Sequence, residues 1–167
     1  MILWLAQGFG VGRIPFAPGT FGSVVGLHWT AILFASDSLL VFFCGIAGGL
    51  AISVWTCGEG EKILKQKDPG SIVMDEIAAI PLCFLTWPFL FKSAPPLGTL
   101  FQNHWPGVTL IFVLFRIFDI LKPWPVKQSQ SLPEGWGVTM DDVLAAFYVN
   151  VCFVAELWLL PARFRVF

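Results

Sequence analysis

The chain has 167 residues, of which 56% are hydrophobic and only 13% are charged, and its mean hydropathy is +0.76. Soluble domains carry charged residues at about a quarter of their positions, so the composition favours an integral membrane protein over a soluble helical bundle with an oversized core. The formal net charge of −1 argues against nucleic-acid binding, because that function needs a basic patch to replace counterions.

Five apolar segments follow one another along the chain. None shows the alternation of a strand, so each is predicted to be a helix, and Pro81 and Pro88 are expected to bend the third. Several are shorter than the roughly 20 residues that a spanning helix needs, so we expect about four to five apolar helices. The sequence predicts an all-α, multi-helical integral membrane bundle that forms a single domain over residues 1–167. The segments cover residues 21–35, 39–57, 72–91, 107–121 and 143–160.

The four cysteines lie singly within apolar stretches and form no CxxC pair. We therefore predict buried thiols rather than a disulfide framework or a zinc site. These residues are Cys44, Cys57, Cys83 and Cys152.

Most acidic residues lie in polar islands between the apolar segments. Nine of the eleven carboxylates fall within three islands, which cover residues 13–23, 59–76 and 116–142. If consecutive helices form hairpins, all three islands meet on one side of the membrane. Lys and Arg are in excess on that side, and only Lys92, Arg163 and Arg165 are expected on the other side of the membrane. An excess of Lys and Arg marks the cytoplasmic face.

The first island ends where the first apolar segment begins. Backbone N–H groups of Thr20, Gly22 and Ser23 at a helix start can bind a phosphate, helped by the helix dipole. Taken alone, the stretch favours ordinary turn chemistry, with Ser23 or Thr20 as the N-cap.

The second island ends in two adjacent acids. Asp68 and Pro69 are typical of a helix start, with Asp68 as the cap. Asp75 and Glu76 then fall about two turns into that helix, with apolar residues on both sides. Adjacent acids at a membrane boundary are costly unless they are paired or bind a metal, so we interpret Asp75 and Glu76 as metal ligands.

The third island combines bases with an acid. Arg116, Asp119 and Lys122 are spaced by three residues, so they line one face at the end of an apolar helix. They form either a self-neutralising ladder of ion pairs or a site in which Arg116 and Lys122 hold a phosphate while Asp119 contacts a metal or a proton.

Two tandem acids close the same island. Thr139 and Asp142 match a capping box ahead of the last apolar segment, and this accounts for Asp142 structurally. Asp141 has no such explanation. Tandem acids at a helix start suit a hard cation with oxygen ligands, such as Mg2+, so Asp141 and Asp142 join the predicted metal ligands.

These residues carry a resemblance to the phosphatidylglycerophosphatase A family. Three stretches match in family order and span most of the chain: Pro18 to Ser23 (PGTFGS), Asp68 to Glu76 (DPGSIVMDE), and Phe115 to Pro125 (FRIFDILKPWP) with Gly137 to Ala145 (GVTMDDVLA). The run from phenylalanine-arginine to lysine-proline is the most specific of them.

The resemblance implies an all-helical, Mg2+-dependent enzyme of phospholipid biosynthesis. Its substrate would be phosphatidylglycerophosphate, whose terminal phosphomonoester is hydrolysed to give phosphatidylglycerol and phosphate. The enzyme would lie in the bacterial cytoplasmic (inner) membrane, with its active site facing the cytoplasm. The chain departs from the family pattern at Ala79, Trp136 and Ala146, where glycine is usual. These departures concern helix packing and loop shape rather than the charged set.

On this hypothesis, Mg2+ held by some of the four predicted ligands positions or ionises a water molecule. Arg116 and Lys122 offset charge on the phosphoryl group, and the backbone of Thr20 to Ser23 adds donors. Asp119 orients Lys122 or moves a proton, and an aspartyl-phosphate intermediate remains an open alternative.

Two other classes of protein fit the same composition. A small ion or metal transporter would use the carboxylates along a permeation route, near mid-membrane on several helices, whereas these acids are expected at helix ends and in loops. The other class is a catalytically silent membrane scaffold. Phosphohistidine chemistry is disfavoured because His28 and His104 lie away from the acids in the sequence.

Overall fold

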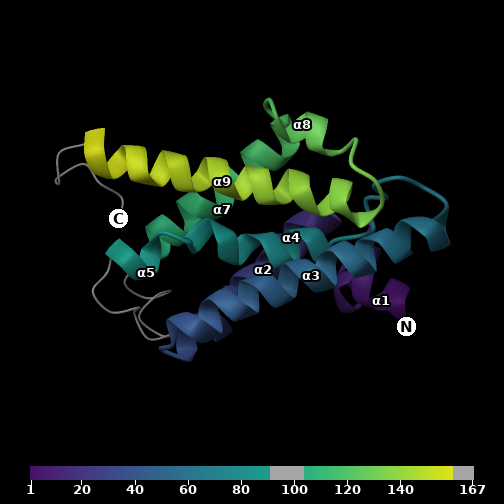
Figure 1. Cartoon of the computed structure of the whole chain (residues 1–167), viewed down its shortest axis with the longest axis horizontal. Coiled ribbons are helices and arrows are strands. Elements are labelled where there is room, and N and C mark those ends of the chain that lie inside the picture. The colour runs from purple at the N-terminus through teal and green to yellow at the C-terminus, as the bar shows by residue number, and fades with distance from the viewer. Residues whose placement is uncertain (91–103, 160–167) are drawn as a thin grey trace.

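A computed structural model describes residues 1–90 and 104–159, and within these ranges it contains helices and no strand. The all-helical prediction is confirmed. Figure 1 shows α9 and α3 as the two long helices, with α4 between them and α2 behind. The elements are α1 (Ile2–Ala6), the 3-10 helix η1 (Gly8–Arg13), α2 (Pro18–Ala35), α3 (Leu39–Leu64), α4 (Met74–Ala79), the 3-10 helix η2 (Ile80–Phe84), α5 (Trp87–Leu90), α7 (Trp105–Leu121), α8 (Val126–Ser129) and α9 (Gly135–Leu159).

Two of the described helices are long and apolar enough to cross a membrane, Leu39–Leu64 and Gly135–Glu156. The 26 residues of α3 rise about 39 Å, which exceeds a hydrocarbon core of about 30 Å. The Oγ atom of Ser38 caps this helix by accepting from the Val41 amide at 3.4 Å. The helix ends at Lys65, whose left-handed φ of 52° is a common helix stop.

The third predicted segment is not one continuous helix. It consists of α4, η2 and the four-residue α5, and the prediction of four to five apolar helices is therefore not confirmed. Pro81 lies in the first positions of η2, where it supplies no N–H for the preceding helix. At Pro81 the structure changes from an α-helix to a 3-10 helix, and the predicted bend itself stays a prediction.

The core lies where these short helices pack among the long ones. Phe42 of α3, Phe84 of η2, Phe115 of α7 and Val149 of α9 are all buried in one cluster. Because α4 contacts α2, α3 and α9, the helix is held in position from several sides. The acids of α4 are thereby held in place.

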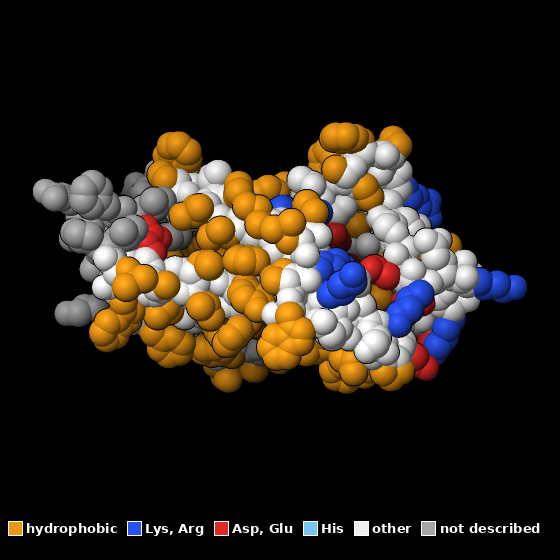
Figure 2. Space-filling view, turned by 90° about the horizontal axis from the view of Figure 1, so that it is seen from above, with side chains coloured by type: hydrophobic (Ala, Val, Ile, Leu, Met, Phe, Trp, Pro, Cys, Tyr) orange, Lys and Arg blue, Asp and Glu red, His pale blue; other side chains and the backbone are white. Residues whose placement is uncertain are grey.

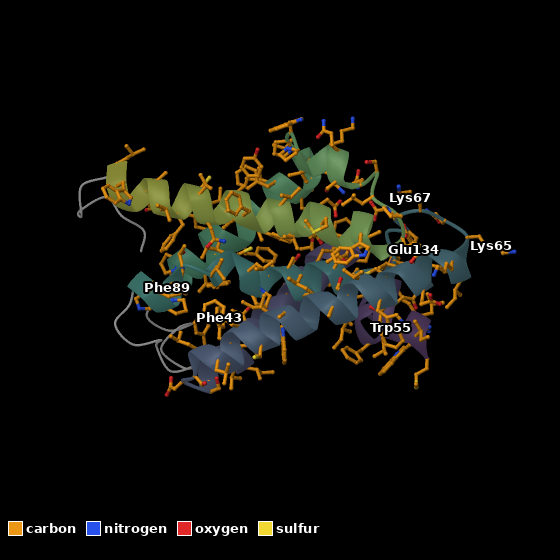
Figure 3. The ribbon with its side chains drawn as sticks, in the orientation of Figure 1. Phe43, Trp55, Lys65, Lys67, Phe89 and Glu134 are labelled. Atoms are coloured by element: carbon orange, nitrogen blue, oxygen red, sulfur yellow. The ribbon has the colours of Figure 1, made fainter. Side chains whose placement is uncertain are left out.

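Charged side chains gather at one end of the molecule, and apolar side chains cover most of the rest of the face that Figure 2 shows. Lys65, Lys67 and Glu134 lie at this end, hereafter the polar end, whereas Phe43 and Phe89 lie toward the other (Figure 3). The predicted opposite-side cations Lys92, Arg163 and Arg165 lie outside the described residues.

The cysteine prediction is confirmed in part. All four thiols are free, and Cys57 and Cys83 are buried. Cys44 is exposed on α3 and Cys152 is half-buried on α9, because both helices turn an apolar face outward. An apolar neighbourhood in the sequence therefore does not mean burial in this protein.

Candidate functional site

The end of α7 and the first turns of α9 meet in an ion pair. The Nζ atom of Lys122 lies 2.6 Å from Oδ2 of Asp141, and the Asp141 side chain is only 5% exposed. Lys122 follows the last residue of α7 with a left-handed φ of 44°, a conformation that commonly ends helices. A short charge-assisted hydrogen bond to a buried carboxylate holds both groups in one geometry.

A second cluster joins α2, α4 and α7 around Arg116. Its Nη1 atom lies 2.8 Å from Oδ2 of Asp119 and 3.4 Å from Oε1 of Glu76. The same nitrogen donates to Oγ of Ser23 at 3.4 Å, and that hydroxyl donates to the carbonyl of Gly19 at 2.9 Å. The guanidinium thus sits between two carboxylates that would otherwise repel each other.

The first turn of α2 lies directly against Glu76. A Cβ atom on Gly19 would stand 2.0 Å from Oε1 of Glu76, and one on Gly22 would stand 2.9 Å from Cβ of Val73. Backbone approach this close requires glycine. The PGTFGS stretch therefore forms the wall against which the Glu76 carboxylate rests.

Three carboxylates of α4 and α9 have buried oxygens that lack a hydrogen-bond partner among the described residues. These atoms are Oδ1 of Asp75, Oε2 of Glu76 and Oδ2 of Asp142. A buried polar oxygen without a partner is costly, and three such oxygens in one region are unusual for a structural role. They can bind a cation or accept protons.

Burial also changes the acidity of the α4 carboxyls. It raises the pKa of Glu76 to about 8, with repulsion from Asp119 adding to the effect and Arg116 opposing it. The pKa of Asp75 is raised as well, first by burial and then by repulsion from Glu76 and Asp141. Perturbed carboxyls in a shared site are typical of functional centres.

Comparison with known proteins decides the class of this site. The model of the family described as Phosphatidylglycerophosphatase A matches residues 4–156. The chain belongs to the phosphatidylglycerophosphatase A family. It is therefore a phosphatase, and the transporter alternative is set aside.

Named relatives agree with the family model. The chain is 35% identical to Phosphatidylglycerophosphatase A of Haemophilus influenzae, over 93% of this chain and 89% of the relative. It is 32% identical to Phosphatidylglycerophosphatase A of Escherichia coli, over 84% of this chain and 74% of the relative. A Putative phosphatidylinositol-3-phosphatase of Bacteroides thetaiotaomicron is 32% identical, over 93% of both chains. No solved structure matches the chain.

The structure joins the predicted site residues in two networks. Glu76, Arg116, Asp119 and Ser23 form the first, and Lys122 with Asp141 forms the second. The ladder interpretation of the third island is correct for the Arg116–Asp119 pair. Asp119 does not orient Lys122 as one alternative predicted, because it pairs with Arg116 and leaves that role to Asp141.

Two predicted helix starts are wrong. The helix after Asp68 and Pro69 begins only at Met74, so Asp75 and Glu76 lie in its first turn rather than two turns in. The helix that carries Asp141 and Asp142 begins at Gly135, so Thr139 is not a cap. Its hydroxyl instead lies 2.8 Å from Oγ of Ser53 on α3.

The N-cap of the helix that follows the first island also differs from the prediction. α2 begins at Pro18 with Ala17 as its N-cap, so neither Thr20 nor Ser23 has that role. The Thr20 amide donates to the Ala17 carbonyl at 2.9 Å and is not free for a phosphate. Of the predicted phosphate-binding residues here, Ser23 is the one that contacts a cation of the site.

The donor set of this phosphatase fits Mg2+ in chemistry but does not form a closed cage. Within residues 1–90 and 104–159, no group of three His, Cys, Asp or Glu side chains is arranged to hold a metal ion. Mg2+ commonly uses one or two carboxylates, retains water and takes its other ligands from a substrate phosphate. The partnerless oxygens of Asp75, Glu76 and Asp142 meet that requirement.

Sequence reasoning missed Gln130 as a member of the second network. Its Nε2 atom donates to Oδ2 of Asp141 at 2.9 Å and to Oδ2 of Asp68 at 3.0 Å. Asp68 Oδ2 also lies 3.8 Å from Lys122 Nζ. No local pattern marks Gln130, because only the tertiary fold brings the loop after α8 to the loop before α4.

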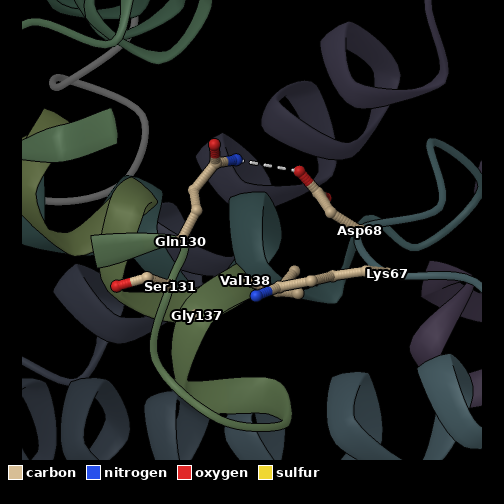
Figure 4. Close-up of a pocket in the computed structure, with 6 residues that line it drawn as sticks. All are labelled: Lys67, Asp68, Gln130, Ser131, Gly137 and Val138. Carbon is tan, nitrogen blue, oxygen red and sulfur yellow. Dashed lines mark hydrogen bonds between the residues drawn. The ribbon is translucent and has the colours of Figure 1, made fainter. Parts of the chain in front are cut away.

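A pocket of about 340 Å³ opens beside these residues. Figure 4 shows the Gln130–Asp68 hydrogen bond across one side of it and Lys67 reaching in from the same loop as Asp68. The pocket gives the polar end a concave surface next to the Lys122–Asp141 pair. Its lining residues are Lys67, Asp68, Gln130, Ser131, Gly137 and Val138.

Proposed function

We propose that this protein hydrolyses the terminal phosphomonoester of phosphatidylglycerophosphate, with Mg2+, to give phosphatidylglycerol and phosphate. The observation that carries the proposal is the pairing of Arg116 with Glu76 and Asp119, and of Lys122 with Asp141, together with buried carboxylate oxygens that have no partner among the described residues. Two relatives named Phosphatidylglycerophosphatase A support the choice of substrate.

In this proposal the two cations neutralise the substrate phosphate. Arg116, held by Glu76 and Asp119, and Lys122, held by Asp141, are fixed before substrate binds, so little reorganisation is needed when charge develops on the phosphoryl oxygens. The Ser23 hydroxyl lies beside Arg116 and adds a neutral hydrogen-bonding group. Asp119 and Asp141 act as positioning residues for the two bases.

One or two of Asp75, Glu76 and Asp142 would hold Mg2+, because each has a buried oxygen without a hydrogen-bond partner among the described residues and carboxylate oxygens are hard ligands. When bound, the ion supplies Lewis-acid polarisation of a phosphoryl oxygen and a water of lowered pKa. Asp141 is the least suited of the four predicted ligands, because its Oδ2 accepts from both Lys122 and Gln130.

The reaction itself is a simple displacement at phosphorus. A water oxygen forms a bond to phosphorus, the bond from phosphorus to the glycerol oxygen breaks, and that oxygen leaves with its electron pair and takes up a proton. The positive charges of Arg116 and Lys122 stabilise the extra negative charge during this exchange. The protein thus contributes mainly position and electrostatics.

In the same proposal, α3 and α9 cross the bacterial inner membrane and the polar end faces the cytoplasm, where phospholipid biosynthesis supplies the substrate. The exposed apolar residues along both helices, such as Leu40, Ile52, Phe147 and Trp158, support a lipid environment, since such patches are rare on soluble monomers.

The test uses purified full-length protein in detergent micelles with phosphatidylglycerophosphate. Phosphate release should require Mg2+ and stop with a chelator, and Asp75→Asn and Asp142→Asn should each abolish it. Asp37→Asn is the matched control, because Asp37 is exposed between α2 and α3 and its positive φ of 48° suits asparagine.

Two results would contradict the proposal. One is equal phosphate release from both site variants and the wild type. The other is preferential hydrolysis of phosphatidylinositol 3-phosphate, the substrate named for the Bacteroides relative, with phosphatidylglycerophosphate left intact.

A further inference from the structure

An apolar groove of about 450 Å³ lies between the first helices and α4. Its walls come from α1, η1, α2, α3 and α4, and they include Val25, Ile32, Ile52 and Ile77. It is separate from the polar pocket beside Gln130 and shares no lining residue with it. Nothing in the proposed phosphate chemistry uses this groove.

The groove and the carboxylate site share the helix α4. Met74 and Ile77 line the groove, whereas their neighbours Asp75 and Glu76 belong to the carboxylate site. A six-residue helix thus has an apolar ligand surface on one side and the phosphate site on another. A molecule that is apolar in one part and phosphorylated in another could contact both.

Two exposed aromatic side chains lie at the end of the groove nearer the polar end, and a third, Trp29, lies beside Gly49 farther along it. Phe9 and Trp55 both line it and are both 55% exposed, and Figure 3 shows Trp55 on the half of α3 toward the polar end. Aromatic residues are enriched where hydrocarbon meets headgroups. From Trp55 to Gly49 along α3, the groove extends about 9 Å away from that level.

We infer that this groove binds one acyl chain of the phospholipid substrate. The inference rests on the proposed function, because it assigns the tail of a lipid whose phosphate reaches Arg116 and Lys122. The groove has the composition that an acyl chain needs, it runs from an aromatic level toward the apolar half of the molecule, and it borders the helix that carries Asp75 and Glu76. Each methylene buried there adds to substrate affinity.

Two adjacent glycines of α3 provide a matched test. A Cβ atom on Gly49 would meet Trp29 Nε1 at 3.7 Å and Ala78 Cβ at 3.8 Å, both ordinary contacts, so a larger side chain there enters the groove. A Cβ atom on Gly48 meets nothing within 4 Å, so the same substitution there projects away from the groove. Gly49→Phe and Gly48→Phe therefore change the helix equally and the groove unequally.

The kinetic experiment compares phosphatidylglycerophosphate with long acyl chains and its dihexanoyl analogue. Gly49→Phe should raise KM for the long-chain substrate on the order of tenfold, since several methylenes lose their contacts. It should leave the dihexanoyl analogue unaffected, and Gly48→Phe should change neither. Unchanged KM for the long-chain substrate, or an equal loss on both substrates in a variant whose melting temperature is unaltered, would overturn the inference.

A binding experiment separates this inference from the proposed reaction. Long-chain phosphatidylglycerophosphate with a diazirine in one acyl chain should label groove residues such as Ile32 and Ile52 in the wild type and in Gly48→Phe, but not in Gly49→Phe. Unlabelled phosphatidylglycerophosphate should compete, and phosphatidylcholine should not.

Competition by both lipids would show that bulk lipid fills the groove and would overturn the inference. Labelling with the expected competition but without hydrolysis would remove only the proposed function.

Discussion

Oδ2 of Asp141 accepts a hydrogen bond from Lys122 Nζ at 2.6 Å, and the Asp141 side chain is almost fully buried. This contact fixes the lysine at the end of α7 to the second turn of α9. We expect Lys122→Met to lower kcat for phosphate release by about a hundredfold or more, because a preorganised charge on the phosphoryl group is lost.

Lys65→Met is the control for charge alone, since Lys65 is exposed at the end of α3. Its kcat should equal that of the wild type. The role assigned to Lys122 would be wrong if both lysine variants kept wild-type turnover. Lys122→Arg should rescue little, because a guanidinium does not match a site shaped for an ammonium.

The amide of Gln130 is expected to matter through the orientation of Asp141. Gln130→Ala removes the donor that bridges Asp141 and Asp68, and we expect kcat to fall by about tenfold with little change in KM. Gln130→Glu should be worse, because it places a third carboxylate beside the other two. Steady-state kinetics of both variants measures this order.

Ser131→Ala tests whether any change in this loop has the same effect. The Ser131 hydroxyl donates to the nearby Gln128 carbonyl at 2.8 Å, and the variant should behave as the wild type. Equal kinetics for Gln130→Ala and Gln130→Glu would argue against an electrostatic role for Gln130.

The close approach of α2 to Glu76 makes Gly19 sensitive to a single methyl group. Gly19→Ala would place its Cβ atom 2.0 Å from Glu76 Oε1, so the carboxylate or the helix must move. We expect loss of activity and a lower melting temperature, since the misplaced carboxylate also loses its contact with Arg116.

Gly70→Ala is the matched control for Gly19→Ala, because a Cβ atom on Gly70 meets nothing within 4 Å. It should retain activity and melting temperature. Wild-type activity in Gly19→Ala would mean that Glu76 has no fixed position in the site.

The apolar runs of the sequence predicted most of the helices but not their ends. α3 continues past Cys57 to Leu64, because the charged residues of its last turns still support helix, as the Lys62–Glu59 pair at 2.9 Å shows. From the sequence alone, the charged residues of these turns favour a loop rather than a helix. The polar end of α3 extends beyond the apolar stretch that composition alone identifies.

The start of α9 was mispredicted for a tertiary reason. Gly135 and Gly137 resemble a loop ahead of a capping box, and glycine is a poor helix former. In the fold, a Cβ atom on Gly135 would stand 1.9 Å from the Val54 carbonyl oxygen of α3. The close contact between helices that glycine permits offsets its low propensity, and it places Asp141 and Asp142 inside a helix.

The candidate site was predictable in its charged residues and not in their pairing. Asp75, Glu76, Arg116 and Lys122 were identified because charge is rare in so apolar a chain. The partners of Arg116 and Lys122 depend on how α2, α4, α7 and α9 cross, which no spacing in the sequence encodes. Gln130 was missed for the same reason.

The raised pKa of Glu76 predicts that Mg2+ binding depends on pH. Without metal this carboxyl is largely protonated below its pKa of about 8, so the ion must displace a proton. The apparent dissociation constant for Mg2+ should therefore decrease as pH rises from about 6 to about 9, with proton release on binding.

Stability should respond to pH in the opposite direction in the metal-free protein. Because the folded-state pKa is above the unfolded value of an acid, ionisation favours the unfolded chain. The melting temperature should fall as pH rises from the ordinary glutamate value of 4.5 to about 8 and level off above it, and added Mg2+ should restore it most at the alkaline end.

Calorimetry in buffers of different ionisation enthalpy measures the proton release, and thermal unfolding with and without Mg2+ measures the stability. Glu76→Gln removes the titrating group and should flatten both dependences, whereas Asp37→Asn should leave them as in the wild type. A pH-independent Mg2+ affinity in the wild type would show that Glu76 does not exchange its proton for the ion.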